Sequence, residues 1–269
     1  IAGILEGDFG ESIVTKRPVL DDIKSYLPAT LELALITAVL IIVFGILLGI
    51  VSTKYSGKWL DGIIRTLSYF GICAPAFLWA VFAMLLFAYM LPILPISGRI
   101  SAGISPPAMV TGMYTIDFLL QGDVAGALDA LKHLILPAVV MSFAGISQAA
   151  RITRSSMVEN LDKPYAYAER AYGIPENKIL HKYLLKPSLN STISVMALDI
   201  AGIFGSAFLV EQIFGYPGLS NYGLTAMLNK DVFAVSAVVM VLGIIVIIFN
   251  LLADLVIRAL DPRVRLQEK

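Results

Sequence analysis

Two acidic residues lie inside long apolar stretches of the chain, where an ionisable side chain is costly to bury. Glu32 falls one turn into an apolar block that begins LPATLELAL, and Asp199 falls in the middle of VMALDIAGIFG. A carboxylate at membrane depth must face protein or water, so each is a functional candidate. We favour a pathway-lining or gating role for Asp199, with a structural acid packed between helices near Gly202 and Gly205 as the alternative. For Glu32, which can reach the membrane interface, we favour the structural role.

The chain carries none of the residue patterns that support nucleotide binding or metal-dependent hydrolysis. It has no Gly-x-x-x-x-Gly-Lys-Ser/Thr stretch, and GKW at 57–59 lacks every other part of a phosphate-binding loop. His133 and His181 are its two histidines, with no His-Glu-x-x-His, and the single cysteine, Cys73, excludes an internal disulfide. We therefore predict a chain that is not an enzyme and that holds no metal and no cofactor of its own.

The elements that must position the two acids are membrane-spanning helices. The chain has 269 residues, 58% of them hydrophobic, and a mean hydropathy of +0.81. The apolar residues gather in blocks, and a helix of about 20 such residues crosses a bilayer. We expect an all-α membrane protein with five transmembrane helices. The predicted spans are Leu27–Ser52, Ile64–Leu91, His133–Ala150, Leu189–Phe214 and Val232–Ile257.

The lysines and arginines between these spans predict their orientation. Fourteen lie on one side and six on the other. The side with fourteen is predicted to be cytoplasmic, which places the N-terminal segment outside and the C-terminus inside. The odd number of spans leads us to expect a further helix before Ile1.

The whole chain, residues 1–269, then forms a single transmembrane domain. It has an outside segment at 1–26, outside loops at 92–132 and 211–231, and a cytoplasmic loop at 151–188. The loop at 211–231 is rich in glycine and aromatic residues. The sequence leaves two alternatives for this loop. One is a re-entrant or surface turn beside a pathway, and the other is a plain hairpin.

The cytoplasmic loop contains YAYAERAYGIPENKILHKYLLKPSL, a basic segment with a Gly-Ile-Pro break. Asp162 could cap a first short helix that has Pro164 in its first turn and stops at Gly173. Pro175 could open a second short helix. Its apolar residues Ile179, Leu180, Tyr183 and Leu184 share one face, and Lys178, Lys182 and Lys186 share another. Two interpretations of this segment remain open. It is either an interfacial element held by lipid headgroups or a docking element for a cytoplasmic partner.

Several stretches together resemble a known protein family. The chain resembles the inner-membrane permease subunits of binding-protein-dependent ABC importers of the dipeptide, oligopeptide and nickel type, over essentially its whole length. The resemblance implies a type I importer permease fold with a core of six spans, the first of which would precede Ile1. The stretches are GDFGESIVTKRPV (Gly7–Val19), LPATLELAL (Leu27–Leu35), LKHLILPA (Leu131–Ala138), ARITRSSMVENL (Ala150–Leu161), VEQIFGYPGLSNY (Val210–Tyr222) and ALDPRVR (Ala259–Arg265).

The resemblance also implies site residues, because the cytoplasmic loop corresponds to the coupling loop of that family. Gly173 and Ala168 match the glycine and an alanine of its Glu-Ala-Ala…Gly motif, whereas Tyr167 and Glu169 replace the other two motif residues. The residues implied in coupling to an ATPase are Tyr165, Ala168, Glu169, Arg170, Ala171, Gly173, Ile174, Pro175 and Glu176. The translocation pathway or its gate is expected at Asp199, Gly202, Phe214 and Tyr216.

The function that the resemblance implies is one half of a translocation pathway for peptides in the prokaryotic inner membrane. A paralogous permease would form the other half, two ATPase subunits would use ATP and Mg²⁺, and an external binding protein would deliver the substrate. Membrane lipid is an expected partner and nucleic acid is not. Nickel chelates and oligosaccharides are alternative substrates.

Two other functions compete with this one. A secondary transporter or channel driven by an ion gradient would usually show inverted repeats and several intramembrane charges. No clear repeat and only two deep acids are present in the sequence. An intramembrane protease would need a nucleophile with its base, or paired acids, within the bilayer, and no such set is apparent.

Overall fold

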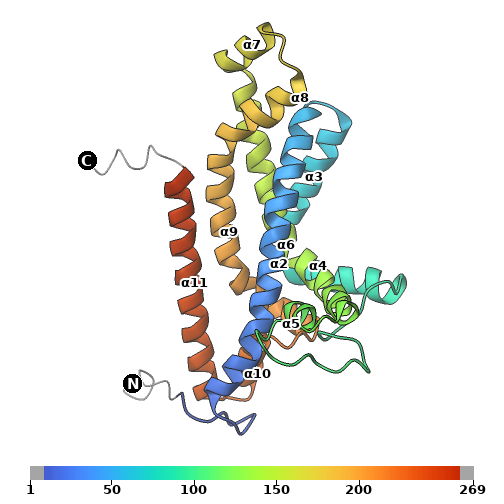
Figure 1. Cartoon of the computed structure of the whole chain (residues 1–269), viewed down its shortest axis with the longest axis vertical. Coiled ribbons are helices and arrows are strands. Elements are labelled where there is room, and N and C mark those ends of the chain that lie inside the picture. The colour runs from blue at the N-terminus through green and yellow to red at the C-terminus, as the bar shows by residue number, and fades with distance from the viewer. Residues whose placement is uncertain (1–8, 261–269) are drawn as a thin grey trace, which may run out of the picture. The chain divides into compact units, whose positions relative to one another are not determined.

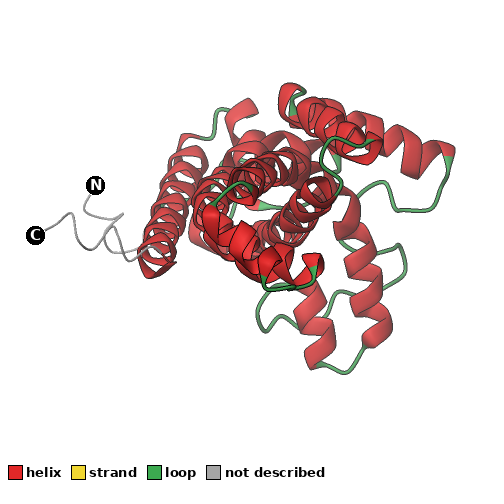
Figure 2. Ribbon diagram, turned by 90° about the horizontal axis from the view of Figure 1, so that it is seen from above, coloured by secondary structure: helices red, strands yellow, loops and turns green. Residues whose placement is uncertain are grey.

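The computed structural model of the chain describes residues 9–260. Within that range the regular structure is helical, apart from one isolated antiparallel bridge between Glu11 and Pro18. Figures 1 and 2 show the helices and the loops that join them. In chain order they are α2 (Val19–Lys54), α3 (Trp59–Cys73), α4 (Ala76–Ala83), the π-helix η1 (Met84–Met90), α5 (Tyr114–Leu120), α6 (Val124–Leu161), α7 (Pro164–Ala171), α8 (Glu176–Lys178), the π-helix η2 (Ile179–Leu184), α9 (Leu185–Ile213), α10 (Leu219–Leu228) and α11 (Val232–Leu260).

Four helical segments in the described range are long and apolar enough to cross a membrane. They are Val19–Lys54, Val124–Leu161, Glu176–Ile213 and Val232–Arg258, and α3 with the following α4 and η1 makes a fifth if the pair counts as one broken span. The predicted all-α membrane fold is confirmed. The helices are longer than the apolar blocks, however, because polar turns extend them. The expected span His133–Ala150, for example, is the middle of α6.

The second expected span, Ile64–Leu91, is not one helix. Helix α3 ends at Cys73, and α4 begins at Ala76. Between them Ala74 is extended, with φ −92° and ψ 132°. Pro75 accounts for the break, because proline lacks an amide hydrogen and disfavours helical geometry in the residue before it. Hydropathy alone could not reveal this break, since alanine and proline leave the stretch apolar.

The chain divides into two compact units. Unit 1 comprises residues 1–37, 76–141 and 203–247, and unit 2 comprises residues 38–75, 142–202 and 248–269. Each expected site residue falls in one unit or the other. The loop at 151–188 belongs to unit 2, and the loops at 92–132 and 211–231 belong to unit 1.

In unit 1, Asp231 ties the described part of the N-terminal segment to the start of α11. Its carboxylate accepts hydrogen bonds from the hydroxyl of Ser12 at 2.6 Å and the amide of Ile13 at 2.7 Å. It also caps α11 by accepting from the amide of Ala234 at 3.1 Å. Burial works to raise the pKa of Asp231, but these hydrogen bonds outweigh it and leave that pKa below its usual value. The carboxylate therefore stays ionised at neutral pH.

In unit 2, α2 and α6 pack closely because small residues face each other. A Cβ placed on Gly45 would lie 2.5 Å from the Cβ of Ala149, and one on Gly49 would lie 2.4 Å from the Cβ of Thr153. Such distances leave no room for a larger side chain. Packing through small residues is a common way for helices to associate in lipid.

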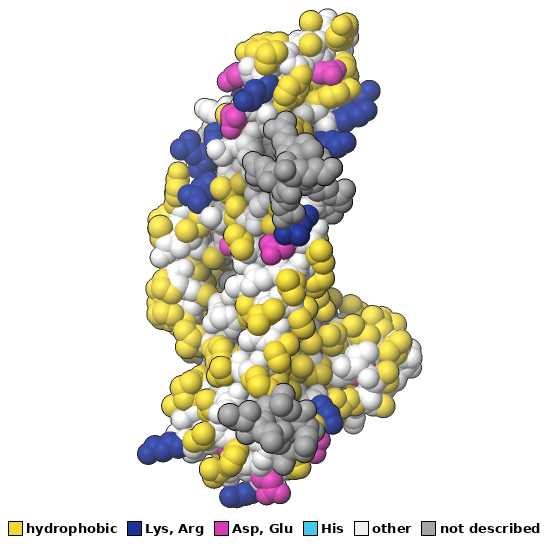
Figure 3. All heavy atoms as spheres, turned by 90° about the vertical axis from the view of Figure 1, so that its left-hand side faces the viewer, with side chains coloured by type: hydrophobic (Ala, Val, Ile, Leu, Met, Phe, Trp, Pro, Cys, Tyr) yellow, Lys and Arg dark blue, Asp and Glu magenta, His cyan; other side chains and the backbone are white. Residues whose placement is uncertain are grey.

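Large hydrophobic side chains are exposed along α11. In unit 2 they include Leu251, Leu252 and Leu255, with 57%, 51% and 61% of their surfaces exposed. The side of Figure 1 on which α11 lies faces the viewer in Figure 3, and much of that face is hydrophobic. Such a surface is suited to lipid or to the apolar surface of another subunit.

Replacing Gly49 with alanine should destabilise the α2–α6 contact. The new methyl group would overlap Thr153, and overpacking of this kind costs about 1–3 kcal/mol. Gly62→Ala is the matched control, because a Cβ on Gly62 meets nothing within 4 Å. It should be neutral or raise stability by up to about 1 kcal/mol through helix propensity. Denaturation of the purified chain in detergent, followed by circular dichroism, compares the two, and equal stability of both variants would contradict the proposed packing.

Candidate functional site

Part of the loop at 151–188 folds as an elbow, which we define as residues 164–178. Helix α7 starts with Pro164 at its first position, and Gly173 follows it with φ +75°. The amide of Gly173 donates to the carbonyl of Arg170 at 2.9 Å, and the amide of Ile174 donates to the carbonyl of Glu169 at 3.1 Å. The predicted stop at Gly173 is confirmed, because glycine adopts a positive φ without the strain that other residues incur.

Two local predictions for this loop are wrong. The N-cap of α7 is Lys163 rather than Asp162, and no side chain caps the helix. The second short helix is also not separate, since α8 continues into η2 and then α9, so that Glu176–Ile213 forms one span. Apolar periodicity continues through this region, so the sequence gives no signal for a boundary there.

A hydrophobic cluster in unit 2 anchors the elbow to the spans. Ala166 of α7 and Ile179, Leu180 and Leu184 of η2 are buried together with Ile50 of α2 and Met157 of α6. The predicted apolar face of the second helix is confirmed for Ile179, Leu180 and Leu184, and Tyr183 is half-buried. The sequence did not single out Ala166, although it is fully buried.

Beyond the cluster, the elbow presents an exposed surface. Helix α7 is uppermost in Figure 1, and charged and hydrophobic side chains are intermixed at the same end of the space-filling view in Figure 3. Tyr167 and Tyr172 are exposed by 57% and 85% of their surfaces. Of the residues expected in coupling, Glu169, Arg170 and Ile174 are half-buried, and the exposed ones are Tyr165, Ala168, Ala171, Gly173, Pro175 and Glu176.

An ion pair within the elbow joins its two arms. The guanidinium of Arg170 lies 3.1 Å from the carboxylate of Glu176, and another of its nitrogens lies 3.4 Å from the carbonyl of Leu161. Because Arg170 sits before Gly173 and Glu176 sits after it, the pair restrains the bend. Arg170 and Glu176 therefore act within the elbow, whatever else they contact.

In unit 1, Glu32 is buried in a polar network. Its carboxylate pairs with Arg99 at 2.7 Å and accepts from the amide of Thr115 at 2.7 Å. The Arg99 guanidinium also lies 3.5 Å from the centre of the Tyr114 ring and donates to the carbonyl of Gly112 at 2.9 Å. The structural role favoured for Glu32 fits this arrangement, although the acid pairs with protein groups instead of reaching the interface.

Phe214 and Tyr216 lie in the interior of unit 1. Their side chains are exposed by 2% and 1%. The hydroxyl of Tyr216 lies 3.4 Å from Glu32, and burial, together with that carboxylate, raises the pKa of Tyr216. The phenol therefore keeps its proton and donates to Glu32. This placement favours a structural role, so contact of either residue with a substrate would require a rearrangement.

The sequence did not single out Glu211 as a buried acid. It is fully buried in unit 1 and accepts hydrogen bonds from the hydroxyl of Thr30 at 2.6 Å and the amide of Asn221 at 2.9 Å. A Cβ on Gly218 would lie 2.3 Å from this carboxylate. The loop at 211–231 is thus not a plain hairpin, because it folds over Glu211 and contains the largely buried helix α10.

Asp199 differs from the buried acids Glu32 and Glu211. It is half-buried in α9, within unit 2, and its Oδ2 atom has no hydrogen-bond partner among the described residues. Gly202, one turn further along α9, is exposed, and a Cβ placed on it would meet nothing within 4 Å. The surface of α9 is therefore open at Gly202, whereas the Oδ2 atom of Asp199 is covered by the chain itself.

Neither histidine belongs to a candidate metal centre among the described residues. The Nδ1 atom of His133 lies 2.9 Å from the carbonyl of Asp129, and that of His181 lies 2.7 Å from the carbonyl of Asn177. Within residues 9–260, no group of three or more His, Cys, Asp or Glu side chains is arranged to hold a metal ion.

Comparisons with known proteins all find membrane components of transport systems. The family model described as a binding-protein-dependent transport system inner membrane component matches residues 41–266. The chain is 37% identical over 264 residues to the probable D,D-dipeptide transport system permease protein DdpB of Escherichia coli K12, covering 98% of this chain and 78% of that protein. It is 32% identical to the dipeptide transport system permease protein DppB of Alkalihalophilus pseudofirmus, covering 96% and 78%.

A solved structure has a similar fold. It is described as an inward-facing conformation of the MetNI methionine ABC transporter, and the match has a TM-score of 0.61. The match covers 87% of this chain and 93% of that chain at 14% sequence identity. At that identity the likeness concerns the fold, and it supports the type I permease architecture.

Removing the cation of the Glu32–Arg99 pair should strongly destabilise unit 1. Arg99→Met leaves the Glu32 carboxylate buried without its charge partner, a change that costs about 3–5 kcal/mol in proteins. Lys24→Met is the control, since Lys24 and Asp21 form an exposed pair at 3.8 Å, worth less than about 1 kcal/mol. Detergent unfolding curves measure both. Equal losses in the two variants would show that the buried pair does not stabilise the fold.

Proposed function

Because the chain belongs to the family of binding-protein-dependent transport system inner membrane components, we propose that it forms one half of the pathway of an ATP-driven importer of short peptides. As a member of this family it is a multi-pass permease of the inner membrane. A paralogous permease supplies the other half of the pathway, two ATPase subunits drive it, and an external binding protein delivers the peptide.

The observation that carries this proposal is the elbow. It offers exposed aromatic side chains on a short helix, and its base is fixed to α2, α6 and η2 through buried Ala166. Tyrosine is enriched at sites that dominate protein–protein binding. An ATPase cleft that closes around α7 would displace the elbow as a rigid body, and the buried cluster would pass that displacement to the spans.

The elbow faces the cytoplasm in this proposal. Fourteen lysines and arginines lie on its side of the expected spans, and six lie on the other. Positive loops stay on the cytoplasmic side during membrane insertion. The N-terminal segment then lies outside and the C-terminus inside.

Asp199 is the residue of this chain that we assign to the translocation pathway. A carboxylate within a span whose oxygen has no protein partner in the described residues needs water, a substrate or another subunit. The surface of α9 is uncovered one turn further along, at Gly202. An acid here suits the ammonium group of a peptide. We place peptides first among the possible substrates also because both relatives are named as dipeptide permeases.

An ion-gradient mechanism is the competing function, and one experiment separates the two. Cells that express the chain together with its transport partners are given labelled dipeptide while an ionophore collapses the proton gradient and ATP is maintained. An ATP-driven importer keeps its uptake under these conditions. Loss of uptake with ATP intact would instead indicate a secondary transporter.

Gly173→Val should uncouple ATP hydrolysis from uptake. A β-branched residue at φ +75° is strained, at a cost of about 1–3 kcal/mol, so the bend of the elbow should change. Gly122→Val is the matched control, because Gly122 has φ +76° and equally open surroundings but lies in unit 1, outside the elbow. ATPase activity and uptake are measured together. Normal uptake in Gly173→Val would count against the elbow as the docking element.

Asp199→Asn should reduce peptide uptake while the subunits still assemble. The amide keeps the shape of the side chain but removes the negative charge that would pair with a peptide ammonium. Ser194→Ala is the control on the same helix, since the Ser194 hydroxyl bonds to the carbonyl of Asn190, at 2.9 Å, within its own helix. Uptake and copurification of subunits are the readouts. Failure of assembly in Asp199→Asn would assign the acid a structural role.

A further inference from the structure

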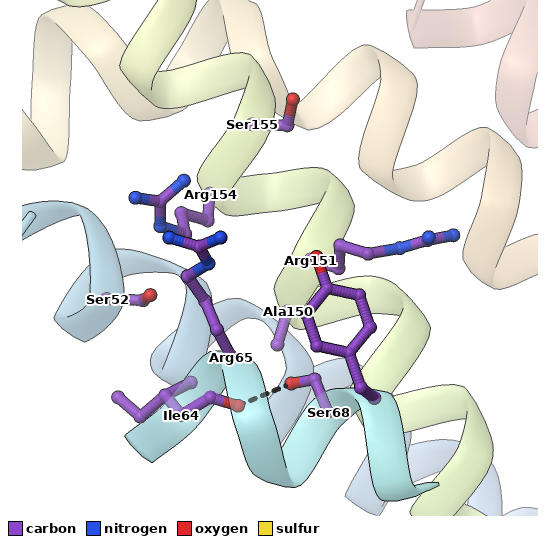
Figure 4. Close-up of a pocket in the computed structure, with 9 residues that line it drawn as sticks. Ser52, Ile64, Arg65, Ser68, Ala150, Arg151, Arg154 and Ser155 are labelled. Atoms are coloured by element: carbon purple, nitrogen blue, oxygen red, sulfur yellow. Dashed lines mark hydrogen bonds between the residues drawn. The ribbon is translucent and has the colours of Figure 1, made fainter. Parts of the chain in front are cut away.

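Unit 2 contains a polar cavity that the proposed transport function does not use. It lies where α2, α3 and α6 meet and has a volume of about 320 Å³. Three arginines line it, Arg65 from α3 and Arg151 and Arg154 from α6, together with the hydroxyl-bearing residues Tyr69 and Ser155. In Figure 4, Arg65 and Arg154 point to the same side of the cavity, and Arg151 extends to the other side.

One of the three arginines is neutralised within the protein. Buried Asp61 accepts from the Nε and Nη2 atoms of Arg154 at 2.6 and 2.7 Å and from the hydroxyl of Ser52 at 2.6 Å. Sequence reasoning had not identified this pair, which joins residues 93 positions apart. It fixes Arg154 in the wall and holds α3 to α6.

The positive charges of the other two arginines are not offset by a carboxylate. Neither Arg65 nor Arg151 forms an ion pair with a carboxylate in the described part of the chain. The Nη2 atom of Arg151 donates to the side-chain oxygen of Gln148 at 2.7 Å, which does not offset the charge. The cavity therefore carries an excess of two positive charges beside hydroxyl donors. Guanidinium groups bind phosphate oxygens through paired hydrogen bonds, so a phosphate suits this lining.

Helix α3 changes from charged to apolar along the side that borders the cavity. Arg65, Tyr69 and Ile72 lie four and three positions apart, so they share one face of the helix. Tyr69 and Ile72 are exposed by 51% and 39% of their surfaces, and Trp59 at the start of α3 is exposed by 75%. Trp and Tyr are enriched at membrane interfaces. A lipid could therefore place its headgroup at Arg65 and an acyl chain along Ile72.

We propose that this cavity is a phosphate-binding site, and the apolar row on α3 assigns the phosphate to the headgroup of an anionic phospholipid. A bound lipid would brace α3 against α6 by bridging Arg65 and Arg151. This inference does not depend on the transported substrate or on coupling to an ATPase, because it requires only that the chain lies in a membrane.

Lipid titration of the purified full-length chain tests the site. Native mass spectrometry in detergent counts bound dioleoylphosphatidylglycerol, with dioleoylphosphatidylcholine as the headgroup without net charge. A separate arm adds inorganic phosphate alone as a free anion. We expect phosphatidylglycerol to bind in preference to phosphatidylcholine. Arg65→Gln and Arg151→Gln should each weaken its binding about five-fold, the effect of one basic residue at an anionic surface.

Two further variants make the result specific. Lys58→Gln removes an exposed cation from the α2–α3 turn, close to the cavity in sequence but outside its lining, and should leave binding unchanged. Arg65→Lys keeps the charge and should retain part of the affinity. Circular dichroism confirms that every variant remains helical, so that loss of binding is not loss of fold.

The outcomes are distinct. Binding of inorganic phosphate alone, with neither lipid retained, would keep the phosphate site but overturn its assignment to a lipid headgroup. Equal retention of both lipids, or unchanged binding of phosphatidylglycerol in the double variant Arg65→Gln/Arg151→Gln, would overturn the proposal. Capture of an acidic protein segment with no response to lipid or phosphate would also overturn it.

Discussion

The burial of Ala166 beside Ile50, Met157 and Leu184 is the contact on which the proposed mechanism depends. A helix of eight residues such as α7 is too short to persist alone in water, so its structure comes from this packing. The cluster gives the elbow a fixed base, and the Arg170–Glu176 pair restrains its bend. A subunit that grips the exposed side of α7 would therefore move a rigid lever instead of deforming a loop. Without the cluster, the same exposed surface could bind a partner but could not transmit its motion.

The second constraint on the structure is that buried acids need hydrogen-bonding partners inside the protein. Glu32 has Arg99 and the amide of Thr115, Glu211 has Thr30 and the amide of Asn221, and Asp61 has Arg154 and Ser52. These networks stabilise the two units from within, because an apolar solvent offers no hydrogen bonds to an orphaned carboxylate. Asp199 is an exception, because its Oδ2 atom has no hydrogen-bond partner among the described residues. That contrast is the reason why we propose Asp199, and not the paired acids, for the pathway.

Local features of the chain could be predicted from the sequence, and long-range pairings could not. Apolar blocks predicted the spans, and the stop at Gly173 was predictable because a positive φ is a property of a single residue. The break at Pro75 was missed because the flanking residues are uniformly apolar. Glu211 was missed for a different reason, since its partner Thr30 lies 181 positions away and only the folded chain brings them together. The same holds for Asp61 and Arg154, which made the arginine-lined cavity invisible to pattern analysis.

The π-helix η2 lets this segment carry one extra residue without redirecting the elbow. In η2 the amide of Leu185 bonds to the carbonyl of Leu180, five residues back, so the turn holds one residue more than an α-helical turn. The wider turn absorbs that residue, so the helix on either side keeps nearly the phase that a continuous α-helix would have without it. In an ordinary α-helix the same extra residue would rotate everything before it by about 100° about the helix axis and turn Ile179 away from Met157. The π turn therefore keeps the apolar face of η2 on the buried cluster although the segment is one residue longer.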